Sequence, residues 1–252
     1  MRESVDDLGA VWAPAAPPQR VVSLVPSLTE AVAVTAPGLL VGATDYCTHP
    51  EGLDVTRVGG SKYPTIGTVL ALEPDLVLAN EEENRAEDVA ALRAADIPVW
   101  VTAPRTLDQA LHSLRRMLAA CDLGCPQWWE DARRAWRPTE EATPVRAVVP
   151  VWRRPWIELG RDTFAGDVLA RLGVTNLLAG HAERYPRLTL AELHALRPEL
   201  VVLPDEPYRF TTDDGPEAFP GTRCALVSGR HLTWYGPSLA EARDLLADQL
   251  RG

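Results

Sequence analysis

Asp45, Cys47 and His49 place three groups with metal-binding chemistry within five consecutive residues. Carboxylate, thiolate and imidazole groups all ligate zinc. Their spacing matches no closed zinc site, and a Cys47–His49 nucleophile pair would need an oxyanion hole that no neighbouring motif provides. Cys47 and His49 are therefore weak candidates for a metal site, and the metal is unknown.

The short motifs of the large enzyme families are missing from the sequence. There is no GxSxG elbow, no P-loop, no GxGxxG and no HExxH. The five histidines are scattered along the chain. We therefore predict a non-catalytic protein that has no catalytic residues and needs no cofactor.

The composition of the chain argues against some classes of binding partner. The 252 residues are 46% hydrophobic and 24% charged, which is usual for a globular protein. A net charge of −10 argues against nucleic acid and anionic membrane surfaces as partners. We expect a monomer whose partner is a small molecule. The four cysteines form no CxxC pair, so buried free thiols are expected.

The beginning of the sequence bears on location. Residues 1–20 are acidic and rich in proline, without the apolar core of an export signal. No apolar run approaches the roughly 20 residues that span a bilayer. The expected location is cytoplasmic; the alternative is an exported or cell-surface protein whose recorded start is misassigned.

Strands alternate with helices in both halves of the chain. In the first half, apolar runs predict strands at residues 20–25, 39–43, 75–79 and 97–101, with helices at 27–35, 65–72 and 83–95. In the second half, strands are predicted at 145–151, 174–178, 199–203 and 224–227, with helices from 162 or 163 to 172, at 189–196 and at 237–250. Ser27 with Glu30 and Thr189 with Glu192 have capping-box spacing. This alternation predicts an α/β fold with parallel sheets.

The two halves resemble each other. Residues 71–82 align without gaps on residues 195–206, with six of twelve positions identical at an offset of 124. The stretch from Thr106 to Arg137 has helical spacing that is interrupted at Gly124-Cys125-Pro126. We predict an N-terminal lobe at 1–104, a helical connector at 105–140 and a C-terminal lobe at 141–252. Chance similarity within one α/β domain is the alternative.

Ligands of open parallel sheets bind beyond the carboxyl ends of the strands. The residues that follow the predicted strands are rich in rings, carboxylates and arginine, which suits a large, flat small molecule. The candidate ligand-binding residues are Tyr46, Asn80, Glu81, Glu82, Trp152, Arg153, Trp156, Tyr185, Asp205, Glu206, Tyr208, Phe210, Trp234 and Tyr235. The tryptophans could equally pack in the core, and residues 81–83 could be only an acidic helix N-terminus.

Residues 20–30 (RVVSLVPSLTE), 40–46 (LVGATDY) and 70–77 (LALEPDLV) resemble the binding proteins of cobalamin and ferric-siderophore ABC importers. These are the class III, or helical-backbone, periplasmic binding proteins, and the likeness extends from about Arg20 to the C-terminus. It is closest to the cobalamin-binding branch. The resemblance implies two αβ lobes joined by a helical backbone, with a flat ligand held by aromatic side chains in a cleft between the lobes.

The resemblance also implies an ABC permease as partner. Family members dock it through one surface glutamate on each lobe, and these positions fall here at Gly67 and near Ala191, beside Glu192. The docking glutamates are therefore not well matched. Ferric siderophores and haem are usually anionic, which the acidic strand tips oppose, although Lys62, Arg153, Arg154 and Arg209 could compensate. We expect a non-catalytic binder of cobalamin or a related corrinoid or metal chelate. The alternative is a cytosolic metal-handling protein or enzyme on the same fold.

Overall fold

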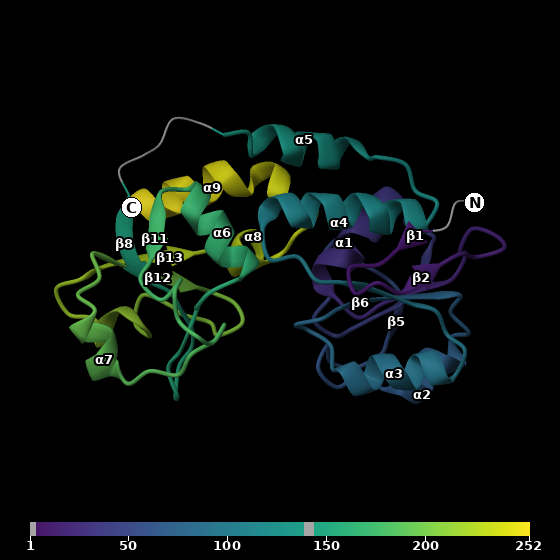
Figure 1. The fold of residues 1–252 in the computed structure, drawn as a ribbon, viewed down its shortest axis with the longest axis horizontal. Helices are drawn as coiled ribbons and strands as arrows, with labels where there is room; N and C mark the ends of the chain where they lie inside the picture. The colour runs from purple at the N-terminus through teal and green to yellow at the C-terminus, as the bar shows by residue number, and fades with distance from the viewer. Residues whose placement is uncertain (1–3, 139–143) are drawn as a thin grey trace. The chain divides into compact units, whose positions relative to one another are not determined.

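A computed structural model describes residues 4–138 and 144–252 of the chain (Figure 1). The fold divides into two compact units. The N-terminal unit contains Met1–Pro104, Gln109–Asp131 and Tyr235–Pro237; the C-terminal unit contains Arg105–Asp108, Ala132–Trp234 and Ser238–Gly252. In the described part of the chain, no helix has the length and apolar character needed to cross a bilayer.

The N-terminal unit is built on a parallel five-stranded sheet of order β5-β4-β3-β6-β7. Its strands are β3 (Val21–Ser23), β4 (Leu40–Ala43), β5 (Thr56–Arg57), β6 (Leu76–Asn80) and β7 (Val99–Thr102). A hairpin of β1 (Ser4–Val5) and β2 (Val11–Trp12) precedes the sheet. The helices α2 (Ile66–Ala71) and α3 (Ala86–Ala94) cover one face, and α1 (Pro26–Thr35) and α4 (Leu107–Ala120) lie on the other (Figure 1).

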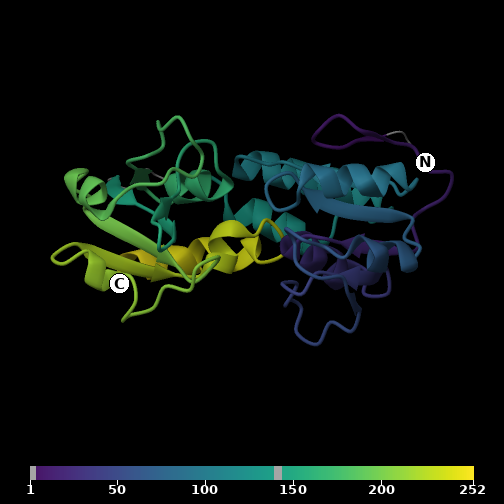
Figure 2. The same ribbon diagram turned by 90° about the horizontal axis from the view of Figure 1, so that it is seen from below.

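The C-terminal unit repeats this plan with four parallel strands in the order β11-β8-β12-β13. Its strands are β8 (Val145–Val148), β11 (Val174–Asn176), β12 (Leu200–Pro204) and β13 (Arg223–Val227). The helices are α6 (Phe164–Arg171), α7 (Leu190–Ala195), α8 (Gly229–Thr233) and α9 (Leu239–Arg251), with a 3₁₀ turn at Pro216–Ala218. The closing helix α9, yellow in Figures 1 and 2, packs on β13.

The sequence repeat is visible in the topology. The C-terminal order β11-β8-β12-β13 matches β4-β3-β6-β7 of the N-terminal sheet, which has β5 as an additional edge strand, and β6 corresponds to β12. The residue before the matched proline is left-handed in both copies: Glu73 has φ 45° before Pro74, and Arg197 has φ 49° before Pro198. A non-glycine residue with positive φ is uncommon. Its occurrence at both aligned positions supports true structural duplication over chance similarity.

Several predicted helix ends are confirmed. The Thr189 side chain accepts from the Glu192 amide while the Glu192 carboxylate accepts from the Thr189 amide, which completes the capping box. Thr163 caps α6 by accepting from the Gly166 amide. The Ser27 box is wrong, because α1 begins one residue earlier at Pro26 and its N-cap, Val25, has no side-chain cap. Proline at the first helical position needs no N–H partner there.

The predicted strand at residues 145–151 is two elements. β8 ends at Val148, and β9 (Pro150–Trp152) turns to form an antiparallel hairpin with β10 (Ile157–Glu158). Proline lacks the N–H that a continuing strand would donate, which explains the break at Pro150.

The predicted helical stretch is also two elements. α4 ends at Ala120, and α5 (Gln127–Ala135) begins after the Gly124-Cys125-Pro126 interruption. Residues of both helices belong partly to each unit. Their role as a connector stays a prediction.

Candidate ligand-binding surfaces

Two exposed tyrosines mark the strand ends of the N-terminal unit. Tyr46 follows β4 and is 66% exposed; Tyr63 follows β5 and is 72% exposed. The Arg85 guanidinium lies over the Tyr63 ring at 4.6 Å from its centroid and forms an ion pair with Asp88 at 2.8 Å. Tyr63 was not predicted as a site residue. Its position after the turn-forming run Gly59-Gly60-Ser61 was the available signal.

Asn80 and Tyr235, both predicted ligand contacts, are bonded to each other. Both side chains are buried, and the Asn80 amide donates to the Tyr235 hydroxyl at 2.7 Å. The Asn80 side-chain oxygen accepts from the amides of Glu82 and Glu83, and Thr102 lies 2.8 Å from the Tyr235 hydroxyl. Burial raises the pKa of Tyr235 above its ordinary range. In this structure the pair joins the ends of β6 and β7 to residue 235, and ligand contact by either stays a prediction.

The acidic residues after β6 lie closer to solvent. Glu81 is exposed and Glu82 is half-buried. The Lys62 ammonium donates to the Glu82 carbonyl, which ties the loop after β5 to the loop after β6. The loop that carries these carboxylates is therefore linked to the loop that carries Tyr63.

The weak metal candidates sit in different surroundings. Cys47 is fully buried, and its sulfur lies 3.0 Å and 3.1 Å from the hydroxyls of Thr29 and Thr44. Burial raises the pKa of the Cys47 thiol, which disfavours the thiolate that a metal needs. His49 is half-buried, with Nδ1 3.1 Å from the Thr48 hydroxyl. Among the residues that the structure describes, no three of His, Cys, Asp or Glu gather as a metal site.

The C-terminal unit carries an aromatic cluster on two loops. Trp152 meets Tyr208 edge-on at 5.6 Å between ring centroids, and Trp156 stacks on Phe210 at 6.1 Å. Tyr208 and Phe210 are 4.7 Å apart, and Trp156 also contacts Phe219. The structure thus brings four predicted ligand residues from the β9–β10 hairpin and the loop after β12 together. Phe210 is buried within the cluster, while Trp152 is 42% exposed.

Arg153 fixes this cluster to a third segment. Its guanidinium forms ion pairs with Asp214 and Glu217 and lies 5.2 Å from the Trp156 ring centroid. The Tyr208 hydroxyl donates to Asp214 at 2.5 Å, and this bond, followed by the Arg153 charge, holds the pKa of Asp214 below its ordinary value. Asp214 and Glu217 were not predicted. These two carboxylates offset the charge of the Arg153 guanidinium, which the sequence alone presents as a free cation.

Asp205 and Glu206, after β12, are joined to α8 and the residue that follows it. The Gly229 amide donates to Asp205 at 2.6 Å, and the Trp234 indole donates to Glu206 at 3.2 Å. A β-carbon at Gly229 would lie 2.6 Å from the Glu206 amide nitrogen, so only glycine fits this approach. Burial and then the Asp205 charge raise the pKa of Glu206. Trp234 is buried, whereas Tyr185, after β11, is 42% exposed.

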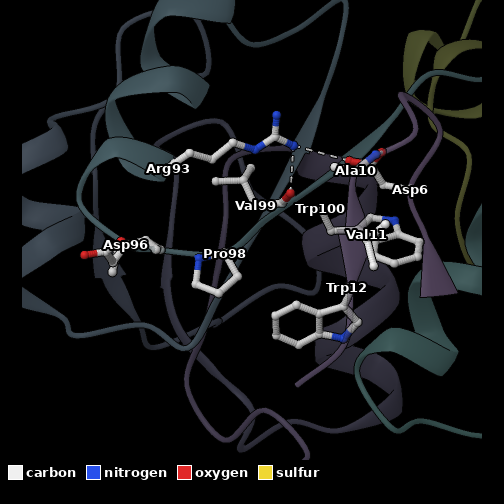
Figure 3. A pocket seen from close by; sticks show the side chains of 10 residues that line it. Asp6, Ala10, Val11, Trp12, Arg93, Asp96, Pro98, Val99 and Trp100 are labelled. Carbon is white, nitrogen blue, oxygen red and sulfur yellow. Dashed lines mark hydrogen bonds and ion pairs between the residues drawn. The ribbon is translucent and has the colours of Figure 1, made fainter. Parts of the chain in front are cut away.

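Two cavities lie away from these residues. One, of about 310 Å³, lies between the β1–β2 hairpin and edge strand β7 and is lined by Trp12, Arg93, Pro98 and Trp100 among others (Figure 3). Another, of about 1320 Å³, is lined mainly by α6, β11 and α9 in the C-terminal unit. Neither contains a predicted ligand residue.

The exposed aromatic residues share one position in the fold. In the described part of the chain, the aromatic side chains more than one-third exposed are Tyr46, Tyr63, Trp152 and Tyr185. Tyr46, Tyr63 and Tyr185 follow β4, β5 and β11, and Trp152 ends β9, the short strand that follows β8. This is the edge where open parallel sheets bind ligands.

Two αβ units with parallel sheets of matching order define the fold of the class III periplasmic binding proteins, and this chain has that fold. The periplasmic vitamin B12 binding protein BtuF of Vibrio cholerae superposes with a TM-score of 0.75 at 20% identity, covering 93% of this chain and 97% of that one. A periplasmic heme binding protein from Pseudomonas aeruginosa gives a TM-score of 0.71 at 23% identity, over 93% and 94% of the two chains.

Comparison of sequences also finds similar binding proteins. A vitamin B12-binding protein of Vibrio cholerae is 24% identical over 196 residues, covering 73% of this chain and 70% of the relative. No family model matches the chain. The predicted fold class is therefore confirmed.

The predicted cytoplasmic location is wrong. Similar solved structures are of periplasmic proteins, which are exported. The prediction depended on the first residues of the recorded sequence. An apolar run that is missing there does not decide the compartment.

Proposed function

We propose that this protein is a non-catalytic binding protein for a corrinoid, with cobalamin as the first candidate. The observation that carries the proposal is the set of four exposed rings, Tyr46, Tyr63, Trp152 and Tyr185, at the carboxyl ends of strands. Flat rings bury a large apolar area at little entropic cost, and their polar tips still form hydrogen bonds. The corrin ring offers an apolar face, and its amide rim offers donors and acceptors.

Charge favours a corrinoid over an anionic chelate. Glu81 and Asp205 are exposed directly after β6 and β12. The Arg153 guanidinium forms ion pairs with Asp214 and Glu217. An anionic haem or ferric siderophore would therefore meet carboxylates, offset only as far as the exposed Lys62, Arg154 and Arg209 reach the ligand, whereas neutral amides would meet no such repulsion. The vitamin B12-binding relatives support the same choice.

We also propose that the protein serves as the substrate-binding component of an ABC importer. The relatives named vitamin B12-binding protein support this role. Of the two expected docking positions, Gly67 is exposed on α2 but carries no carboxylate. Glu192 is exposed on α7, and its carboxylate accepts from the Thr189 amide at 2.7 Å. A permease that docks here would need contacts other than a matched glutamate pair.

Fluorescence titration tests the binding proposal directly. Purified protein is titrated with cyanocobalamin while the emission of its eight tryptophans is followed. We expect saturable quenching, because Trp152 lies in the proposed contact surface and Trp156 belongs to the aromatic cluster beside it. Absence of quenching at tens of micromolar ligand would overturn the proposal.

A parallel titration separates the ligand classes. Haem and a ferric siderophore are added under identical conditions, with absorbance corrected for inner-filter effects. We expect cobalamin to bind at least about tenfold more tightly than either, a difference of about 1.4 kcal/mol. Tighter binding of an anionic chelate would reassign the ligand while leaving the binding role intact.

A further inference from the structure

Glu158, on β10, is a fully buried carboxyl group with no hydrogen bond. Its side chain is 0% exposed, and neither carboxyl oxygen has a partner in the structure. An unpaired carboxylate is costly in such a place, so the neutral acid is the stable form. No part of the proposed ligand contact uses Glu158.

The position of Glu158 links the segments of two candidate ligand residues, Trp152 and Tyr185. β10 pairs with β9, where Glu158 lies opposite Pro150 and Ile157 lies opposite Trp152. On its other side, the Glu158 amide donates to the Pro186 carbonyl at 2.9 Å, and the Gly160 amide donates to the Arg184 carbonyl at 2.8 Å. One short strand thus holds the β9 segment that ends at Trp152 and the segment that contains Tyr185.

Charged side chains lie on both segments that pair with β10. Beside β9 stands Arg153, which is engaged with Asp214 and Glu217. Glu183, Arg184 and Arg187 lie on the segment that pairs with β10, and β12, which contacts β9, carries no titratable side chain in Leu200–Pro204.

The pKa of Glu158 reflects its burial. Burial raises its pKa from 4.5 to about 8, and the nearby Val149 backbone offsets this effect only in part. Because the folded-state pKa lies above the ordinary one, the folded protein keeps a proton that the unfolded chain has lost. The stability from this group is complete below pH 4.5 and is lost as pH rises to about 8.

We propose that Glu158 is a pH-sensitive latch beneath the aromatic surface of the C-terminal unit. Neutral, it lets β10 pack between β9 and residues 184–187. Ionised, it draws water into the strand pairings and loosens the segments that carry Trp152, Trp156 and Tyr185. The consequence for ligand affinity rests on the proposed function; the structural transition does not.

The test begins with the unliganded protein. Tryptophan emission is recorded from pH 5.5 to 9.5 for wild type, Glu158→Gln and Glu183→Gln. Glu183 is an exposed carboxylate on the neighbouring segment and controls for a general charge effect. We expect a transition with a midpoint from about pH 7.5 to 8.5 in wild type and Glu183→Gln, and none in Glu158→Gln. A transition that survives in Glu158→Gln overturns the proposal.

Infrared spectroscopy on the wild type covers the case in which Glu158→Gln does not fold. The carbonyl stretch of a protonated carboxylic acid is followed over the same pH range. We expect one such band to disappear together with the fluorescence change. Loss of all such bands below pH 6, or a band that persists above pH 9.5, overturns the proposal.

Cobalamin affinity is then measured at pH 6.5 and 9.0. Between pH 6.5 and pH 9.0 we expect the cobalamin affinity of the wild type to fall at least about fivefold. The affinity of Glu158→Gln should fall less than about twofold over the same range. Equal losses in both overturn the link between Glu158 and the ligand surface. If cobalamin binds at neither pH, the proposed function fails, and the emission and infrared experiments still decide the latch.

Discussion

Arg20 and Arg146 make the same contact in the two units of this protein. The Arg20 guanidinium donates to the Leu72 carbonyl at 2.6 Å, and the Arg146 guanidinium reaches the Leu196 carbonyl at 3.4 Å. Leu72 and Leu196 end α2 and α7 and are aligned in the sequence repeat. Each arginine therefore joins the start of a first strand to the end of a helix. Duplication has preserved a side-chain contact as well as a topology.

The same junction in each unit contains a carboxylate that can be tested. Asp75 accepts from the amides of Gln19 and Arg20, and the aligned Glu199 accepts from the Arg146 amide. We expect Asp75→Ala and Glu199→Ala each to lower the free energy of unfolding by about 1–2 kcal/mol, because a charge-assisted bond is lost. Urea unfolding measures this. Glu51→Ala, at an exposed loop position, is the control, and an equal loss there would contradict the argument.

Much of the fold was predictable because local signals agreed with the tertiary structure. The runs at residues 75–79 and 199–203 are bounded by proline and lie in strands that are buried throughout, so no competing pattern masked them. The Thr189 box formed because its helix begins where the hydroxyl stands. The Ser27 box failed because Pro26 starts α1 earlier, and the whole first turn is buried.

The candidate site was less predictable, because ring position depends on contacts across loops. Trp152 and Trp234 have the same residue type and were both predicted as ligand contacts, yet one is 42% and the other 7% exposed. Trp234 donates its indole proton to Glu206, a contact across loops that the sequence pattern does not show. Likewise, Arg153 reads as a free surface charge in the sequence, and its partners Asp214 and Glu217 lie about sixty residues further along the chain.

The N-terminal hairpin provides a second prediction about stability. Asp6 is buried and accepts from the amides of Leu8, Ala10 and Val101, the last on edge strand β7. We expect Asp6→Ala to cost about 2–4 kcal/mol of unfolding free energy, since it leaves buried donors without an acceptor. Asp6→Asn keeps one acceptor oxygen and should lose less.

Hydrogen exchange localises this effect. The Val101 amide should exchange faster in Asp6→Ala, whereas the inner strand β3 should change only as far as global stability changes. Asp54→Ala, at an exposed position in the same unit, serves as the control. If the Val101 amide in Asp6→Ala were as protected from exchange as in the wild type, Asp6 would not stabilise this edge of the sheet.

Trp152 separates ligand binding from stability. Its ring is 42% exposed and touches Tyr208 at one edge. We expect Trp152→Ala to weaken cobalamin binding by about 1–2 kcal/mol, or roughly 5- to 30-fold, because a flat contact surface is lost. The titration described above measures it.

The matched variant for Trp152→Ala is Trp128→Ala. Trp128 lies on α5, and its indole donates to the Thr35 hydroxyl at 3.0 Å, away from the strand ends. We expect reduced stability with unchanged affinity. If both variants lost affinity equally, the effect would be general to the fold and Trp152 would have no specific contact.

Low pH should weaken the aromatic cluster of the C-terminal unit. The Tyr208 hydroxyl and then Arg153 hold the pKa of Asp214 below its ordinary value of 3.8. The stability from this group is therefore present above pH 3.8 and is lost as pH falls through the lower folded-state pKa. Tryptophan emission followed from pH 6 to 2 should show this loss. In Asp214→Asn, the acid-dependent part of the change should vanish; an identical acid profile would exclude Asp214 as its source.

Cys47 is expected to be chemically inert in the folded protein. Its sulfur is buried between the hydroxyls of Thr29 and Thr44, and burial raises its pKa, so little reactive thiolate forms. Cys125 is exposed. Alkylation with iodoacetamide at pH 8, followed by mass spectrometry, should label Cys125 at least about 100-fold faster than Cys47, since reaction at Cys47 requires local opening.

Cys125→Ser checks that the fast phase belongs to Cys125. Metal analysis of freshly purified wild type, Cys47→Ser and His49→Ala then tests the weak metal candidates independently. We expect all three proteins to have the same low metal content, well below one metal ion per protein molecule, because the buried neutral thiol is a poor ligand. A stoichiometric transition metal that is lost in both variants would restore the metal site, and it would show that Cys47 leaves its hydroxyl cradle to bind.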